Sequence, residues 1–353
     1  MHSKRPSGIM TFRVTNRKTD NSFEVGPQET VLDAASRQGH GFAYSCRSGS
    51  CGSCKARLIS GRIEPITASE QALSSTDVES GQILLCQARP QSDLVIEAVE
   101  LPAGSSIPIR TLPCRLAKLE LLCHDVMQMT LKLPQNQTFQ YLPGQYIDIL
   151  LRDGRRRSFS IANAQSAETD LELHVRLVPG GHFTQQVFGS LKERDLLRFQ
   201  GPFGTFFLRE SDPGVTLLVA GGTGLAPIKA MLEAAFASGS TRTFQLFWGV
   251  REERDLYGQA MLERWSSRYD NFQYVPVLSD ASADSSWSGE TGWVHEAVMR
   301  RFPDLSRAEV YASGPPPMIE ALKSAVASAG LTEGQLFYDS FEYASDSQGS
   351  IST

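Results

Sequence analysis

The sequence lacks several features that would each define a class of protein. It contains no run of apolar residues near the roughly 18 that a membrane-spanning helix requires. No apolar stretch follows Lys4 and Arg5, so we expect no secretory signal and a cytoplasmic protein, with translation starting at Met1 or Met10. Positive charge is not in excess: the net charge is −5 and the pI is about 5.8, which argues against nucleic acid as the main partner.

The composition does not indicate disorder either. Only 21% of the 353 residues are charged and 41% are hydrophobic, which is enough apolar material for packed cores. The length predicts two or three domains. Lys and Arg number 11 against 11 Asp and Glu in residues 1–100, 13 against 10 in residues 101–210, and 10 against 18 in residues 211–353. Three segments with different charge balances fit three modules.

Cysteine is scarce and unevenly placed. Of the six cysteines, four lie within the first 86 residues, and three of these lie within nine positions. Because the chain is long and shows no secretory signal, a disulfide framework is the weaker interpretation. Cys114 and Cys123 have no metal-ligand spacing, and we expect them to behave as small buried hydrophobic residues.

The clustered cysteines follow the spacing C-x4-C-x2-C with a distant fourth, at Cys46, Cys51, Cys54 and Cys86. This is the spacing of plant-type ferredoxins, in which four thiolates hold a 2Fe–2S cluster. Gly49 and Gly52 allow the backbone to wrap tightly around such a cluster. The alternatives are a structural zinc site or free buried thiols. Zinc sites usually have paired C-x2-C knuckles, and only one is present here.

Composition and periodicity divide the chain into consecutive modules. Residues 10–100 contain a strand-like hairpin, a short helix and the cysteine loop, and a Pro-containing linker spans residues 101–109. Residues 110–210 show short alternating strands separated by turns, which predicts a small antiparallel barrel. Residues 344–353 are polar and are predicted to form a flexible tail.

Residues 211–343 show a different pattern, in which buried strands alternate with helices. This predicts a parallel, doubly wound sheet. The predicted strands span residues 216–220, 243–250, 272–279, 309–313 and 336–341, and the predicted helices span residues 225–238, 258–269, 292–302 and 316–329.

A basic run in the barrel segment ends in Arg157-Ser158-Phe159-Ser160. Arg157 offers a guanidinium fork for a diphosphate, Phe159 a ring that can stack on a flat cofactor, and Ser160 a hydroxyl for the edge of that cofactor. Downstream, Gly181 and Thr184 flank a possible helix start, where backbone N–H groups would face phosphate. A surface basic turn is the alternative for the first motif.

Two glycine-rich turns mark the parallel-sheet segment. The first follows a buried strand, opens a helix and contains Gly221, Gly222, Thr223, Gly224 and Pro227. The second repeats the strand–turn–helix arrangement and contains Gly314, Pro315 and Met318. Such turns at the carboxyl ends of parallel strands predict a crevice for a dinucleotide, with its pyrophosphate at a helix N-terminus. Tight turns without a ligand are the alternative.

Taken together, residues 11–341 resemble the iron–sulfur flavoprotein reductases, in which a plant-type ferredoxin domain is fused to a ferredoxin–NADP reductase-like pair. The motifs above carry the resemblance, together with G-P-x-G at Gly201–Gly204. Within this group the chain most resembles the CDP-6-deoxy-Δ3,4-glucoseen reductase family, through LPCRLAKLE, GPFGTFFLRE and FYDSFEY. The reductases of aromatic-ring dioxygenases are similar in layout. The resemblance implies a beta-grasp 2Fe–2S ferredoxin domain, an antiparallel FAD-binding beta-barrel and a doubly wound, parallel-sheet NAD(P)-binding domain.

The resemblance also implies a path of electrons from NAD(P)H to FAD, then to the 2Fe–2S cluster, and then to a partner protein. The partner would be a PMP-dependent dehydratase or an oxygenase component. FAD rather than FMN is implied by the resemblance alone. Two other functions stay open: a free-standing flavin or quinone reductase, and an electron carrier whose reductase domains are inactive.

Single residues near the nicotinamide are expected to influence hydride transfer. Phe341, at the end of the last predicted strand, is expected to cover the flavin face opposite Phe159, with an ordinary core Phe as the alternative. Ser313 replaces a cysteine that the family often has before G-P-P, and Phe159 replaces the commoner tyrosine. The loop Arg251–Arg254 offers acids for a ribose hydroxyl and arginines for a 2′-phosphate, and we favour NADH over NADPH.

The electron-accepting partner is expected to present an acidic face to the cluster. No acidic residue occurs between Asp33 and Glu64, whereas five cations do: Arg37, Arg47, Lys55, Arg57 and Arg62. Cations around the cluster would steer an anionic partner and raise the association rate. A balanced, solvated surface is the alternative. We expect the protein itself to be a monomer.

Overall fold

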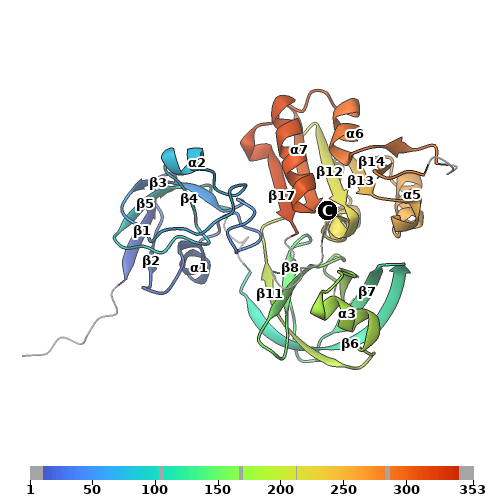
Figure 1. The fold of residues 1–353 in the computed structure, drawn as a ribbon, viewed down its shortest axis with the longest axis horizontal. Coiled ribbons are helices and arrows are strands. Elements are labelled where there is room, and N and C mark those ends of the chain that lie inside the picture. The colour runs from blue at the N-terminus through green and yellow to red at the C-terminus, as the bar shows by residue number, and fades with distance from the viewer. Residues whose placement is uncertain (1–10, 103–106, 167–169, 212, 283–286, 342–353) are drawn as a thin grey trace, which may run out of the picture. The chain divides into compact units, whose positions relative to one another are not determined.

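A computed structural model of the chain describes residues 11–102, 107–166, 170–211, 213–282 and 287–341. The chain forms two compact units, Met1–Ile107 and Pro108–Thr353 (Figure 1). Among the residues described, no helix is both long and apolar enough to cross a membrane.

The first unit is a beta-grasp domain built on a mixed five-stranded sheet. Its strand order is β2-β1-β5-β3-β4, with β1 antiparallel to β2 and parallel to β5. The elements are β1 (Phe12–Asn16), β2 (Ser22–Val25), α1 (Val31–Arg37), β3 (Lys55–Ser60), α2 (Ser75–Glu79), β4 (Gln82–Leu84) and β5 (Leu94–Glu97). Helix α1 begins after Thr30, whose hydroxyl accepts the Asp33 N–H, as expected of an N-cap residue. The predicted hairpin and helix are therefore present.

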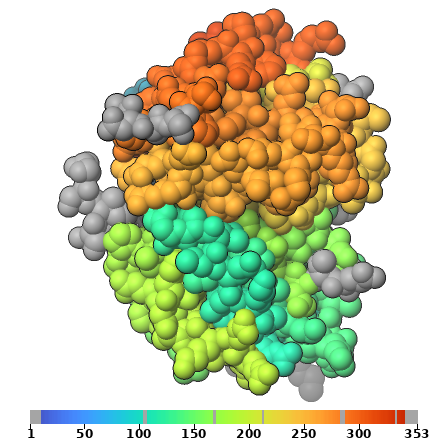
Figure 2. All heavy atoms as spheres, turned by 90° about the vertical axis from the view of Figure 1, so that its right-hand side faces the viewer, coloured from blue at the N-terminus to red at the C-terminus, as the bar shows by residue number. Residues whose placement is uncertain are grey.

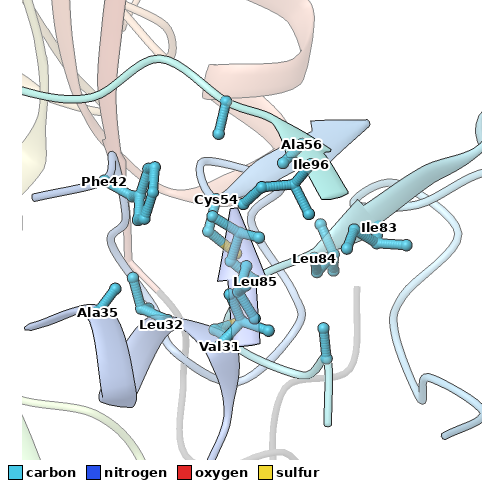
Figure 3. Close-up of a cluster of buried hydrophobic side chains, with 14 of the residues drawn as sticks. Val31, Leu32, Ala35, Phe42, Cys54, Ala56, Ile83, Leu84, Leu85 and Ile96 are labelled. Atoms are coloured by element: carbon cyan, nitrogen blue, oxygen red, sulfur yellow. The ribbon is translucent and has the colours of Figure 1, made fainter. Parts of the chain in front are cut away.

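The core of the first unit lies between α1 and the sheet. Val31 and Leu32 of α1 pack there with residues of β4 and β5 such as Leu84 and Ile96. Cys54 belongs to the same core, and Figure 3 shows its side chain among these apolar groups. One end of the cysteine loop is thus anchored in the hydrophobic core of the domain.

The first half of the second unit is an antiparallel barrel. Its strand order is β10-β7-β6-β11-β8-β9, and a bridge between Ile161 and Leu173 joins its two ends. The elements are β6 (Arg110–Cys123), β7 (Val126–Lys132), β8 (Tyr146–Leu150), β9 (Arg156–Ser160), β10 (Leu171–Arg176), α3 (His182–Gly189) and β11 (Leu196–Phe203). The predicted barrel is confirmed. Its interior is apolar and contains Cys114.

The second half of this unit is a parallel sheet of order β15-β14-β13-β12-β16-β17, which we call the nucleotide lobe. Its strands are β12 (Val215–Gly221), β13 (Phe244–Val250), β14 (Phe272–Leu278), β15 (Glu290–Thr291), β16 (Ala308–Gly314) and β17 (Leu336–Ser340). Its helices are η1 (Gly222–Gly224), α4 (Leu225–Ala237), η2 (Glu253–Asp255), α5 (Gln259–Arg268), α6 (Val294–Arg301), α7 (Pro316–Ser328) and η3 (Glu333–Gln335).

Helices cover both faces of the parallel sheet. Leu218 and Ala220 of β12 face a core shared with α4 and α5, while Leu217 and Val219 face a core shared with α6 and α7. This is the predicted doubly wound arrangement. The sheet has six described strands rather than the five predicted, because β15 has only two residues and is too short to give a periodic signal.

Candidate functional site

The four cysteines of the first motif converge in the structure as two interacting pairs. Cys46 hydrogen-bonds to Cys51, and Cys54 hydrogen-bonds to Cys86. The bond within each pair lowers the pKa of Cys46 to about 5 and also lowers that of Cys86. The same bonds, with burial, raise the pKa values of Cys51 and Cys54. Two pairs of sulfur donors at one place suit a group with two irons, each bound by two thiolates.

Polar groups of the loop are directed at the sulfurs. The Ser48 N–H donates to Cys46 Sγ at 3.4 Å, and the Gln87 amide lies 3.8 Å from Cys86 Sγ. Gly49 has φ +82° and Gly52 φ +77°, a left-handed conformation that favours glycine. Hydrogen bonds to the sulfurs are among the features that set the potential of a cluster. The donor set therefore fits the predicted 2Fe–2S cluster.

The other two cysteines lie in the barrel. Cys114 is buried in the barrel core, and burial raises its pKa to about 12. Cys123 is half-buried and hydrogen-bonds to Asp125 at 3.4 Å. None of the six cysteines forms a disulfide.

The flavin motif occupies strand β9 of the barrel. Arg157 and Phe159 lie two residues apart along it, so their side chains share one face of the strand, and Ser160 lies on the opposite face. The Phe159 ring is half-buried and lies 5.6 Å from that of Phe183, which belongs to α3. The structure therefore brings the first predicted flavin motif next to the second.

The second flavin motif forms the start of helix α3, with Gly181 as its N-cap. The Thr184 hydroxyl accepts the Val178 N–H at 3.1 Å and contacts the Gly181 carbonyl at 3.1 Å, so it holds the turn that precedes the helix. The first N–H groups of an α-helix have no partner within the helix. Phosphate would therefore meet the backbone of this turn rather than the Thr184 hydroxyl.

The first nucleotide turn packs directly against the second. A Cβ on Gly224 would lie 1.9 Å from the Ser313 carbonyl oxygen, and one on Gly221 would lie 2.5 Å from Met318 Sδ and 3.0 Å from Pro315 Cδ. Pro227 is buried in the first turn of α4, which tolerates proline. The Trp248 indole N–H donates to the Gly222 carbonyl at 2.8 Å, which fixes the turn to strand β13. Thr223 is half-buried between these glycines.

The second turn carries the predicted hydride-transfer residues. Ser313 is 0% exposed, and among the described residues its hydroxyl has no hydrogen-bond partner. Such an orphaned buried hydroxyl is uncommon in proteins and fits a site that a cofactor completes. Phe341 is half-buried and donates its N–H to the Gly314 carbonyl at 2.9 Å.

The structure adds one residue that sequence reasoning missed. Asp339, on β17, is a buried carboxylate and accepts a hydrogen bond from the Ser160 hydroxyl at 3.4 Å. This bond crosses from the nucleotide lobe to the barrel and joins Ser160 to the strand that ends at Phe341. The available signal was an acid within the last strand, two residues before the predicted ring-covering aromatic.

Comparisons with known proteins agree with this architecture. Residues 14–91 match the 2Fe-2S iron-sulfur cluster binding domain, residues 113–208 the oxidoreductase FAD-binding domain, and residues 218–324 the oxidoreductase NAD-binding domain. The chain is 31% identical to the Amycolatopsis cytochrome P450 reductase GcoB, with a TM-score of 0.77 over 94% of this chain and 99% of that one. The ferredoxin reductase in carbazole 1,9a-dioxygenase gives a TM-score of 0.67 at 27% identity, over 94% and 99% of the two chains.

Two curated relatives represent different partner systems. The CDP-6-deoxy-L-threo-D-glycero-4-hexulose-3-dehydrase reductase of Yersinia pestis is 42% identical, over 94% of this chain and 99% of the relative. The phenol 2-monooxygenase reductase component DmpP of a Pseudomonas species is 35% identical, over 97% and 98% of the two chains. With three matching domains in the same order and relatives of this similarity along nearly its whole length, the chain belongs to the iron–sulfur flavoprotein reductases.

Proposed function

We propose that the chain is the reductase of a deoxysugar-forming dehydratase that depends on pyridoxamine phosphate. The cofactors are a 2Fe–2S cluster, FAD and NAD(P)H, and electrons pass from NAD(P)H through FAD to the cluster. The observation that carries the proposal is the 42% identity over 99% of the Yersinia pestis dehydrase reductase, against 35% for the phenol monooxygenase component.

The residues that hold the three cofactors are part of the same proposal. The cluster ligands are Cys46, Cys51, Cys54 and Cys86. The FAD-binding residues are Arg157, Phe159, Ser160, Gly181 and Thr184. The nicotinamide nucleotide is held by Gly221, Gly222, Thr223, Gly224, Pro227, Gly314, Pro315 and Met318, and Phe341 and Ser313 lie where the nicotinamide meets the flavin. Four converging sulfurs, the helix start at Gly181 and the orphaned Ser313 hydroxyl support these assignments.

The residues of the chain bind and orient, and no side chain is required as a covalent catalyst. Hydride and single-electron chemistry is supplied by the bound cofactors. Phe159 and Phe183 offer an aromatic wall, and Phe341 offers a second one at the end of β17. Asp339 holds the Ser160 hydroxyl in position.

The loop after β13 supports a preference for NADH. Arg254 makes two contacts with Glu252, from Nε to Oε2 at 2.8 Å and from the terminal nitrogen to Oε1 at 3.1 Å. The Glu252 carboxylate competes with a 2′-phosphate for the Arg254 guanidinium and so weakens its binding of that phosphate. We expect Glu252→Gln to tighten NADPH binding relative to NADH, and the two dissociation constants measured by titration check this.

The experiment that tests the acceptor uses purified components. The holoenzyme is mixed with NADH and a pyridoxamine-phosphate-dependent sugar dehydratase loaded with its CDP-sugar, and the deoxysugar product is followed. Product formation that needs this chain supports the proposal. Rapid NADH oxidation with one-electron dyes but no product contradicts it.

The second candidate function is the reductase component of an oxygenase. The 35% identity over 98% of the phenol monooxygenase component favours it. The same assay with a purified oxygenase component, its aromatic substrate and oxygen distinguishes the two functions. Cluster reoxidation that requires the oxygenase would favour this candidate.

Several finer features belong to the same proposal. We place the module boundaries at residues 10–100, 110–210 and 211–343, with the linker at 101–109, and the predicted tail at 344–353 lies outside the described residues. We place the protein in the cytoplasm, where reduced cysteines persist, as a monomer.

The proposed partner docks through an acidic face against cations near the cluster. Three of the five cations are already paired within the domain: Arg37 with Glu29, Arg47 with Asp33, and Lys55 with Asp77. Arg57 and Arg62 are exposed and make no ion pair with any other described residue. These two therefore contribute most of the steering charge in the docking proposal.

A further inference from the structure

A buried ionic network joins the barrel to the nucleotide lobe. At its centre is Lys229, on α4, which is only 8% exposed. Its ammonium lies 2.9 Å from the Ala162 carbonyl, 3.1 Å from Glu172 Oε1 and 2.8 Å from Glu233 Oε1. Three acceptors use all three N–H donors of a lysine ammonium. The cation is therefore fully satisfied by protein groups, two of them from the barrel.

The network continues into the barrel through His174. Its Nε2 lies 2.9 Å from Glu172 Oε1, and its Nδ1 lies 3.2 Å from the Tyr257 hydroxyl. Burial lowers the pKa of His174 and raises that of Tyr257, so the imidazole is neutral and the phenol keeps its proton. The partners then assign the protons, with Nε2–H donating to Glu172 and the Tyr257 hydroxyl donating to Nδ1.

Two carboxylates share the single ammonium. Burial raises the pKa of Glu172, but the His174 hydrogen bond and the Lys229 charge outweigh it, so the pKa is lowered. Glu233 Oε2 also accepts the Ala164 N–H at 2.9 Å. Removal of Lys229 would leave two carboxylates without their counter-charge in a poorly solvated place, which proteins tolerate badly.

Each side of the network leads directly to a proposed cofactor motif. Ala162 follows Ser160 by two residues, and its N–H donates to the Glu172 carbonyl at 2.7 Å. Lys229 lies in the second turn of α4, the helix that begins after the Gly221–Gly224 turn. Figure 2 shows residues of the nucleotide lobe, in yellow and orange, lying directly on residues of the barrel, in teal and green. One ammonium thus links the chain beside the flavin motif to the helix behind the nucleotide turn.

We propose that Lys229 is a positioning residue for hydride transfer, which sets the distance and orientation of the nucleotide turn relative to the flavin motif. Apolar contacts also hold the two domains together, but they are not directional. Three hydrogen bonds from one ammonium specify a single arrangement. Hydride transfer depends steeply on the approach of the reacting atoms, and a displacement of about 1 Å can cost on the order of 100-fold in rate. The inference rests on the NAD(P)H-to-FAD step and does not depend on which acceptor follows.

The test compares Lys229→Met with Lys118→Met in the full-length holoenzyme. Lys118 is an exposed barrel lysine whose ion pair, among the described residues, is with Glu120 on its own strand, so it controls for loss of a lysine. Each protein, with its flavin content measured, is mixed anaerobically with NADH in a stopped-flow instrument. The limiting rate of flavin reduction and the dissociation constant for NADH are obtained from the concentration dependence. The long-wavelength charge-transfer absorbance, which reports stacking of nicotinamide on flavin, is recorded in the same experiment.

We expect Lys229→Met to lower the limiting rate by roughly 10- to 100-fold. The NADH dissociation constant should stay unchanged, the charge-transfer absorbance should be lost, and Lys118→Met should match the parent. Without any nucleotide, the Ala164 amide should also exchange its hydrogen faster in Lys229→Met, because its acceptor Glu233 is no longer held. Lys229→Arg should recover part of the rate.

A second variant separates positioning from stability. Glu172→Gln, Lys229→Met and Glu233→Gln together remove the buried charges, which restores stability in many proteins with buried ion pairs. This triple variant also replaces Lys229→Met if the single variant does not fold. A reduced limiting rate with normal NADH binding in the folded triple variant supports the proposal. Flavin-loaded variants that are reduced at the parent rate, whatever their melting temperature, overturn it.

Discussion

The cluster loop and the nucleotide turn are both rich in glycine, but for different physical reasons. In the cluster loop, Gly49 and Gly52 have φ values of +82° and +77°, so the backbone itself needs residues without a Cβ. In the nucleotide turn, Gly222 also has a left-handed φ of +53°, but Gly221 and Gly224 have ordinary φ values of −119° and −59°. At these two positions the second turn excludes a side chain. A Cβ on Gly224, for example, would lie 1.9 Å from the Ser313 carbonyl oxygen.

This difference shows how the two sites are assembled. The cluster loop bends around its own ligands, and three of its four cysteines come from one short stretch of chain. The nucleotide site exists only where two turns from distant parts of the sequence touch through their glycines. The first site should therefore be lost by a change of ligand, and the second by a change of packing.

The largest expected effect is that of Cys51→Ser in the cluster loop. A serine oxygen is a poor substitute for a thiolate in holding iron, so we expect loss of the cluster and of electron delivery to any protein acceptor. NADH-to-dye turnover through the flavin should remain, because the flavin and nucleotide motifs lie in the other compact unit. Iron content, flavin content and both activities are measured together.

Cys114→Ala is the matched control for this prediction. It removes a buried thiol from the barrel and should leave the iron content unchanged. Loss of flavin in Cys51→Ser would contradict the independence of the two units.

The next largest effect should be on stability, in Gly224→Ala. Its Cβ would meet a backbone carbonyl that cannot rotate away, so the two nucleotide turns must separate, and overpacking of this kind costs about 1–3 kcal/mol or more. Gly52→Ala in the cluster loop meets only the Ala72 carbonyl at 3.2 Å and should cost about 1–2 kcal/mol through its left-handed backbone. Thermal unfolding followed by circular dichroism compares them.

Gly239→Ala isolates the backbone contribution in the nucleotide lobe. It has φ +69° and no atom within 4 Å of an added Cβ, so it reports left-handed strain alone. If Gly224→Ala destabilised the protein no more than Gly239→Ala, the close approach of the two turns would not limit this position.

The difference between local features and features formed by distant residues also explains how much of the molecule could be predicted from the sequence. The strands of the nucleotide lobe are long apolar runs, and β12, β13, β14, β16 and β17 all lie within two residues of their predicted bounds. Strand β15 and helix α2 have two and five residues and are too short for such a signal. The cysteine motif is local, so spacing alone indicates its ligands.

The parts of the site that sequence reasoning missed depend on contacts between distant residues. Asp339 meets Ser160 across 179 positions, and Lys229 meets the Ala162 carbonyl across 67. Asp339 lies within the FYDSFEY stretch, and Lys229 also pairs with Glu233 one turn along its own helix. Their partners in the barrel, however, follow only from the packing of the lobe on the barrel. The ion pairs of Arg37, Arg47 and Lys55 are a similar case. The stretch between Asp33 and Glu64 has no acidic residue, but these three cations pair with acids at or beyond its ends.

A smaller effect, on nucleotide binding, is expected from Phe341→Ala. This variant tests whether the nucleotide site formed by the two turns extends to Phe341. Phe341 follows β17 and is tied to the second nucleotide turn through the Gly314 carbonyl. If its ring covers the flavin, its removal should tighten nicotinamide binding and weaken discrimination between NADH and NADPH by several-fold. Dissociation constants for both nucleotides check this. A lower melting temperature with unchanged nucleotide binding would mean that Phe341 is an ordinary core residue.

The smallest expected effect concerns the surface around the cluster loop, and it is a change of rate with salt. Arg57 makes no ion pair among the described residues, whereas Arg37 contacts Glu29 through two nitrogens at 2.7 and 2.8 Å. A cation that is already paired adds little to the field that an approaching partner meets. Arg57→Gln should therefore slow electron transfer to the purified partner several-fold at low ionic strength, and more than Arg37→Gln does. The difference should fade as the Debye length falls from ~10 Å at 0.1 M salt toward ~3 Å at 1 M.

NADH-to-dye turnover, which needs no docking, should be the same in both variants. Electron-transfer rates that do not depend on salt and are equal in the two variants would contradict an acidic docking face and would leave the cations of this domain with structural roles alone.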